Sequence, residues 1–225
     1  MADERLDAQV SSVTRLTSDS AWRALRGGRD GALFTADWIQ ALAMEGRVFC
    51  ANAGSATTPI TFGAGSIDTT EPDFALNVPA GTTVIPIEIR VKMETYGTTL
   101  LFETMAAVGS GGTLGTDADI TITSLRTDAP ITTTCNAGAA SAADAVYMTT
   151  NVSEFWRDGL GLAVTVAAAD DDSTNQLETF IWNINTAAAP PVLVGAAQLM
   201  VFASAQAGTG FITCIYAEVP STSIV

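Results

Sequence analysis

Hydrophobic and polar side chains alternate with a period of two along much of this chain. The clearest example is TVIPIEIRVKMET (83–95), in which isoleucine, valine and methionine alternate with glutamate, arginine and lysine. Because successive side chains of a strand point to opposite faces, the pattern predicts a β-strand with one face on a core. Pro86 cannot donate a ladder hydrogen bond, so we expect the start of this strand to lie at a sheet edge or a bulge.

Nine further segments after Arg47 have the composition of short strands. They are RVFCAN, TPITF, DFALNV, TTLLFETMAAV, DADITITSLRT, GLAVTVAAA, QLETFIWNIN, AQLMVFAS and GFITCIYAEV. Sequences rich in turn formers separate them, and no helical pattern of useful length intervenes. This spacing predicts an all-β fold, an antiparallel β-sandwich over residues 47–225. Residues 141–159 fit neither period and leave helix and strand both open.

Residues 1–46 have a different pattern and are predicted to form an N-terminal arm with a short helix. In TADWIQALAMEG, Thr35 is the expected N-cap, Asp37 lies in the first turn and Gly46 lies beyond the end. The predicted apolar face consists of Trp38, Ile39 and Leu42. Upstream, SDSAWRALRGG has room for about one and a half helical turns before the glycine pair, too few to be stable alone.

Two Ala-rich strand candidates raise a packing question. LAVTVAAA and AQLMVFAS have methyl groups where cores normally hold larger side chains. Either the two sheets approach closely or the small faces meet another surface, for which neighbouring subunits are one natural source.

Charge is distributed unevenly between arm and body. The chain has 10 basic and 24 acidic residues, a net charge of −14. Six of the basic residues precede residue 48, so the body is strongly acidic and repels a nucleic acid backbone. The longest apolar run, 192–205, is shorter than the roughly 20 residues that span a bilayer, and the first ten residues lack the pattern of an export signal.

No pattern points to a catalytic centre. Histidine is absent, which removes imidazole as a base or metal ligand, and no GxSxG elbow occurs. Glu88 and Glu94 alternate with Arg90 and Lys92, as on a solvated or interfacial strand face. We therefore expect no enzymatic activity, no catalytic residue and no cofactor.

Metal binding is also not expected. The triplet 170–172 could join Asp117 or Asp119 as oxygen ligands for calcium, but the spacing of a calcium loop is missing and an acidic turn is the simpler interpretation. Cys50, Cys135 and Cys214 form no CxxC pair, so each is predicted to be a small core residue.

The basic arm supplies the candidate interface. The fifteen residues 15–29 contain four arginines and only one acidic residue. Arginine makes bidentate contacts with carboxylates. We expect this arm to lie on the acidic surface of a neighbouring copy rather than on nucleic acid. The predicted subunit-interface residues are Arg15, Trp22, Arg23, Arg26 and Arg29.

The chain resembles the jelly-roll structural proteins of icosahedral viruses and tailed phages. The resemblance lies in the arm of residues 1–46, the strand series from Arg47 to Val219 and the stretch VPAGTTVIPIEIRVKMET. That class includes capsid, cement and decoration proteins. The resemblance implies a jelly-roll-like sandwich, a symmetric assembly such as a trimer, and the virion as location, after synthesis in the host cytoplasm.

The resulting expectation is a non-enzymatic virion protein, cement, decoration or minor capsid, that stabilises a shell through contacts with its own copies and other capsid proteins. A membrane and direct nucleic acid contact are not expected. The alternative is a carbohydrate- or receptor-binding β-sandwich of a phage fibre, in which Trp156 would meet a glycan.

Overall fold

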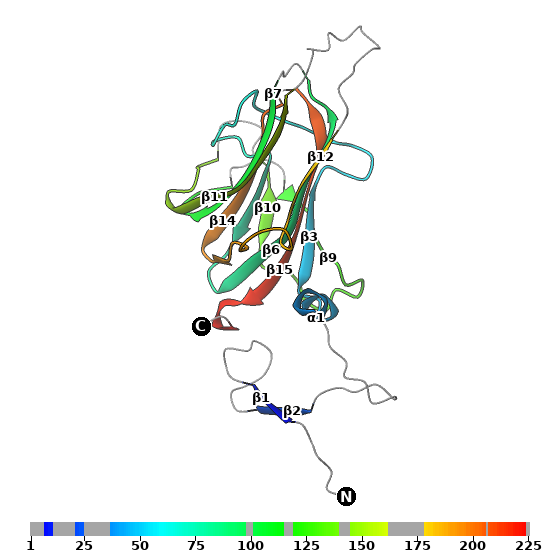
Figure 1. Cartoon of the computed structure of the whole chain (residues 1–225), viewed down its shortest axis with the longest axis vertical. Coiled ribbons are helices and arrows are strands. Elements are labelled where there is room, and N and C mark those ends of the chain that lie inside the picture. The colour runs from blue at the N-terminus through cyan, green and yellow to red at the C-terminus, as the bar shows by residue number, and fades with distance from the viewer. Residues whose placement is uncertain are drawn as a thin grey trace, which may run out of the picture.

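The structure is a computed structural model that describes residues 7–10, 21–24, 37–97, 101–114, 119–139, 145–161, 178–205 and 207–223. Two antiparallel β-sheets pack face to face, and the helix α1 (Trp38–Met44) lies at the same end as the C-terminus (Figure 1). The predicted all-β antiparallel sandwich with a short N-terminal helix is confirmed.

Each sheet is built from strands that are distant in sequence. The first sheet has the order β12-β6-β15-β3-β9, namely Thr179–Asn183, Thr82–Thr95, Thr209–Pro220, Val48–Ala53 and Ile122–Ser124; β4 (Ile60–Thr61) pairs with β15, and β13 (Leu193–Val194) pairs with β6. The second sheet has the order β11-β7-β14-β5-β10-β8, namely Thr150–Gly161, Leu101–Ser110, Ala197–Ala203, Phe74–Val78, Asn136–Gly138 and Asp119–Ile120. A 3-10 turn, η1 (Ser221–Ser223), follows β15.

The strand order is that of a jelly roll. Strand β3 pairs with β15, β5 with β14, β6 with β12 and β7 with β11, all antiparallel. These four pairs are nested in sequence, and they are distributed over both sheets. Such nesting is the double Greek key of the eight-stranded jelly roll, so the jelly-roll-like topology that the resemblance implied is present.

The alternating segment is the central strand β6, and Pro86 lies at the bulge predicted for it. Pairing of β6 with β15 shifts register where Ile215 is opposite Glu88 and Tyr216 is opposite Pro86. On its other side, β6 pairs with β12 over residues 88–92 and with β13 over residues 83–84. The proline therefore lies between two partner strands, where its missing N–H removes no ladder bond.

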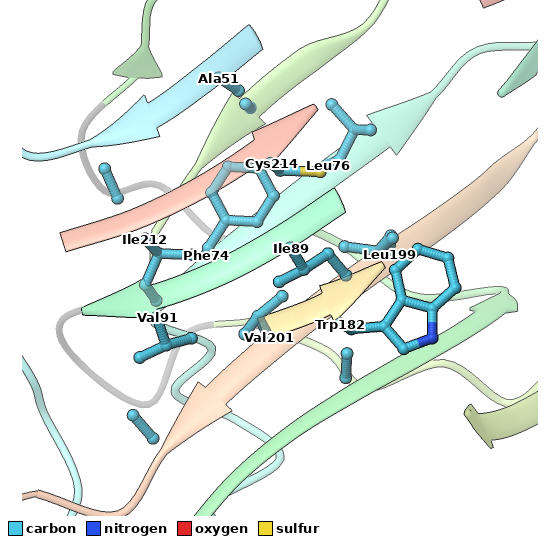
Figure 2. Close-up of a cluster of buried hydrophobic side chains, with 14 of the residues drawn as sticks. Ala51, Phe74, Leu76, Ile89, Val91, Trp182, Leu199, Val201, Ile212 and Cys214 are labelled. Carbon is cyan, nitrogen blue, oxygen red and sulfur yellow. The ribbon is translucent and has the colours of Figure 1, made fainter. Parts of the chain in front are cut away.

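The main core fills the space between the sheets. Its members have little or no exposed surface, and those labelled in Figure 2 are Ala51, Phe74, Leu76, Ile89, Val91, Trp182, Leu199, Val201, Ile212 and Cys214. The buried hydrophobic side chains described in residues 37–223 lie between Leu42 and Val219. The three hydrophobic clusters that they form use residues from Ile39 onward.

A second apolar layer covers the outer face of the second sheet. Met105, Met200 and Phe202 point away from the main core and pack with Met148, while Tyr147 and Ile67 contact them from loops. This layer explains why every residue of β14 is buried. The face of AQLMVFAS that points away from the main core is thus covered by loops of the same chain, not by a neighbouring subunit. The other candidate, LAVTVAAA, lies outside the described residues after Gly161.

A long insertion between β7 and β11 closes one edge of the sandwich. Within it, β8 pairs with β10 in the second sheet, and only Thr121 separates β8 from β9, which pairs with β3 in the first sheet. One continuous segment therefore supplies the outermost strands of both sheets at this edge, and strands of two and three residues offer other chains few backbone groups to pair with.

Glu218 fastens this insertion to the first sheet. Its Oε1 accepts hydrogen bonds from the Thr134 amide at 3.0 Å and the Thr134 hydroxyl at 2.9 Å, and its Oε2 accepts one from the Thr133 hydroxyl. Tyr216 lies 3.0 Å from the same Thr133 hydroxyl. The buried carboxylate is fully supplied with donors, which buried charges require.

Two local expectations about the arm are corrected. The N-cap of α1 is Asp37, which makes no side-chain capping bond, and Thr35 lies outside the described residues. Gly46 follows the helix with φ of 79°, as predicted for the residue beyond the end. The segment expected to form a helical turn contains the strand β2 (Ala21–Ala24), paired with β1 (Asp7–Val10). Four residues are too few for a stable helix, and pairing supplies an alternative.

The segment left open at 141–159 is a strand in its second half. It contains most of β11, whose pairing with β7 has two register shifts. These bulges explain why neither simple period fits the sequence, because each one adds a residue that breaks the alternation.

The cysteine prediction holds for two of three residues. Cys135 and Cys214 are buried in the main core, whereas Cys50 lies on the outer face of β3 and is half-buried. Burial raises the pKa of the Cys135 thiol to about 12 and raises the pKa of Cys50. All three are free thiols held mainly in the unreactive protonated form.

Replacing Glu218 tests how strongly the insertion is anchored. Glu218→Ala removes the carboxylate that accepts bonds from the Thr134 amide and from the Thr133 and Thr134 hydroxyls, so we expect the free energy of unfolding to fall by about 2–3 kcal/mol. Urea unfolding followed by circular dichroism measures the loss. Glu94→Ala, at an exposed position of β6, is the matched control and is expected to change stability by less than about 0.5 kcal/mol. Equal effects of the two variants would contradict this role.

Candidate interaction surface

The two long edges of the sandwich differ in how they are protected. At one edge lie β8 and β9, which have only two and three residues, whereas the other edge consists of β11 in the second sheet and β12 in the first. Among the described residues, β11 pairs only with β7 and β12 only with β6. We call these two strands the open edge. An edge strand offers unpaired backbone groups to other chains unless its sequence blocks them.

The backbone of β12 has free groups along this edge. Met93 N donates to Glu178 O at 3.1 Å, and Ile184 N donates to Ile87 O at 2.9 Å. Since bonding direction alternates along a strand, the amides and carbonyls of Thr179 and Ile181 point away from β6. No described residue bonds to them. The Asn183 carbonyl also points outward, but it accepts the Thr186 amide at 3.0 Å.

Strand β11 is protected by features that β12 lacks. It is bulged at two places, and its exposed residues include Glu154, Arg157 and Asp158. Arg157 pairs with Glu154 at 2.7 Å, while Asp158 accepts the Gly159 amide at 2.8 Å. Bulges and charges discourage pairing with a further strand. Strand β12, with the sequence TFIWN, is regular and uncharged.

Apolar side chains extend from β12 along the same side of the molecule. Ile181 is 47% exposed, and Val192 and Val194 around β13 are 50% and 54% exposed. Both valines line a pocket of about 220 Å³, whose other walls include Val108, Asn151 and Ala197. The pocket therefore lies between β13 in the first sheet and strands β7, β11 and β14 in the second, and β13 pairs with the same side of β6 as β12 does.

The outer face of the first sheet is polar around Glu88 and Arg90, as the alternation predicted, whereas its other end is apolar and packs against Leu42 of α1. Arg90 bonds Glu88 at 2.6 Å, and Asn183 donates to the same carboxylate at 3.1 Å. Lys92 and Glu94 are exposed. These side chains form a solvated strand face and not a catalytic pair.

The structure places only part of the predicted arm interface. Trp22 and Arg23 are central residues of β2, where Ala8 is opposite Arg23 and Gln9 is opposite Trp22. Arg15, Arg26 and Arg29 lie outside the described residues. The two strands form a two-stranded sheet with no third strand among the described residues.

No metal-binding cluster occurs in the described part of the chain. It contains no group of three histidine, cysteine, aspartate or glutamate side chains that could hold a metal ion. Of the calcium candidates, Asp119 begins β8, and Asp117 and residues 170–172 lie outside the described residues. Trp156, the candidate glycan contact, is half-buried and packs against the main core beside a bulge.

Asp73 is the one described carboxyl group with a strongly raised pKa, a property that catalytic acids share. Burial raises its pKa to about 7, although amide donors lower it: Ala203 N at 2.7 Å and Gly63 N at 3.2 Å. Both donors belong to the backbone, so the carboxyl joins a loop to β14. Its role is structural.

Comparison with known proteins gives no relative. No family model matches the chain, and no curated protein or solved structure is significantly similar to it. None of the described helices is long and apolar enough to cross a membrane. The interpretation of function therefore depends on the features of this chain alone.

Asp73 makes stability depend on pH in a defined direction. Its pKa is higher in the folded chain than in the unfolded chain, so its contribution is fully present below about pH 4 and is lost as pH rises to about 7. Relative to Asp73→Asn, the wild type should lose up to about 4 kcal/mol between these values. Urea unfolding of both proteins from pH 4 to 8 measures the difference. If the wild type instead gained stability relative to Asp73→Asn as pH rises, the amide hydrogen bonds would lower the pKa of Asp73 by more than burial raises it.

Proposed function

We propose that this chain is a non-enzymatic structural protein of a virion, a cement, decoration or minor capsid protein that stabilises a shell through subunit contacts. Its partners are copies of itself, most simply as a trimer, and other capsid proteins. The observation that carries the proposal is the open edge, where a regular uncharged strand lies beside exposed valines on an otherwise protected sandwich.

The jelly-roll topology supports the proposal without deciding it. Jelly rolls occur in viral capsids and also in lectins and cupins, and a fold does not fix a function. A cupin-like metal centre has no support, because the described residues hold no metal-binding group. A lectin-like role has less support than shell binding, because Trp156 packs against the core instead of standing free as a stacking platform.

Electrostatics favours a position away from packaged nucleic acid. Each described arginine of the sandwich is paired with a carboxylate of the sandwich: Arg47 with Glu45, Arg90 with Glu88, Arg126 with Asp128 and Arg157 with Glu154. Residues 48–225 contain 17 acidic and four basic residues, so the body repels phosphates. This favours a cement or decoration role over that of the shell protein that faces the genome.

Deleting residues 1–34 tests the arm's role in assembly. The truncated chain retains every residue of the three described hydrophobic clusters, so we expect it to fold with an unchanged circular dichroism spectrum and a change in stability below about 1 kcal/mol. The full chain should form oligomers in sedimentation velocity, whereas the truncated chain should remain monomeric. A full chain that stays monomeric over the whole soluble concentration range would contradict the proposed function. Unchanged assembly after truncation would instead refute the arm's part in it.

A further inference from the structure

We propose that the hairpin formed by β1 and β2 in one copy adds to the free edge of β12 in a second copy. The contact is made through β2 and extends the first sheet of the acceptor. This inference rests on the proposed function, because it names the surface through which the copies assemble.

The donor needs a partner that its own pairing does not supply. Strands β1 and β2 have four residues each and pair only with one another among the described residues. An isolated two-stranded hairpin is marginally stable in water, and a third strand or a packed face is usually required. Addition to an existing sheet provides the third strand.

The acceptor matches the donor in length and in available groups. Strand β12 has five residues, and the amides and carbonyls of Thr179 and Ile181 point away from β6 without a partner among the described residues. A four-residue strand can pair with both of these positions. In strand addition, backbone hydrogen bonds of this kind provide the affinity for the added segment, and neighbouring side chains determine which segment is bound.

Charge selects β2 as the strand in contact. The exposed Glu178 directly precedes β12, and the exposed Asp158 lies on β11. Arg90 is balanced by Glu88, so Lys92 is the one cation of the described residues near this edge without an acidic partner. Strand β2 carries Arg23, whereas β1 begins with Asp7.

A second copy is within reach of the arm. Twelve residues, 25–36, connect β2 to the residue that precedes α1, and a fully extended chain of that length spans roughly 40 Å. Each copy has one donor hairpin and one acceptor edge, so the contact is heterologous. It produces a ring if the rotation closes, as in a trimer.

Two substitutions at one position separate backbone pairing from side-chain contact. Ile181→Pro removes an outward amide that β6 does not use, and proline is tolerated at such edge positions. Ile181→Ala keeps the amide and shortens the side chain. We expect Ile181→Pro to weaken association by at least about tenfold, whereas Ile181→Ala stays within about threefold of the wild type. Sedimentation velocity over a concentration series measures both, with circular dichroism as the check on folding. An equal loss in both variants, or wild-type assembly of Ile181→Pro, overturns strand addition.

Mixing two variants tests whether the arm binds another copy. Ile181→Pro has an intact arm and a blocked edge, while the chain without residues 1–34 has a free edge and no arm. Neither should assemble alone, but together they should form a 1:1 complex. Absence of that complex, when the full chain does assemble, refutes docking of the arm on β12 and leaves the structural role intact. A monomeric full chain refutes the proposed function itself.

Amide hydrogen exchange provides a test without any change in β12. In the full chain, the amides of Thr179 and Ile181 should exchange at least about tenfold more slowly than in the chain without residues 1–34. The protection should rise with protein concentration. Protection that does not depend on concentration would place the arm on its own body and overturn docking on a second copy.

Discussion

The antiparallel pairing of β6 with β15 is the interaction on which the rest of the structure depends. It runs from Thr82 opposite Pro220 to Thr95 opposite Thr209, so it joins residues more than a hundred positions apart. Strands β12 and β13 add to the free side of β6, and β3 and β4 add to β15. The first sheet is therefore organised around one long-range pair, and closing so long a loop has a conformational entropy cost that folding must overcome.

Two features of this jelly roll need protection from solvent or from other chains. They are the apolar outer face of the second sheet and the edge strands of both sheets. This chain covers the first with its own loops, which place Tyr147 and Met148 over Met200 and Phe202. At one edge, the outer strands belong to the short β8–β9 segment, and Glu218 anchors the insertion that contains it. Among the described edge strands, β12 is the longest one without a bulge, a charged residue or a proline. That asymmetry is the physical basis for regarding the edge as an interaction surface.

Some of these features can be predicted from the sequence and others cannot. The period of two in β6 predicts a strand, and Pro86 predicts a bulge, because both follow from the backbone of the residues concerned. The bulges of β11 escape such a prediction, since each one depends on how the strand meets β7. The helical turn expected around Trp22 is a strand for a similar reason: local propensity in four residues is weaker than pairing with residues 7–10. For the candidate surface, the uncharged sequence TFIWN was visible, but its position at an edge was not.

By itself, the sequence determined the all-β class, most of the strands, the acidic body and the absence of imidazole chemistry, because alternation, composition and charge are properties of each residue and its near neighbours. Only the tertiary structure decided which strands are neighbours, which edge is closed, and that Cys50 and Trp156 lie where they do. Those outcomes depend on contacts between residues far apart in the chain, such as Glu218 with Thr134. No local pattern encodes them, since the same alternating strand can occupy the centre or the edge of a sheet.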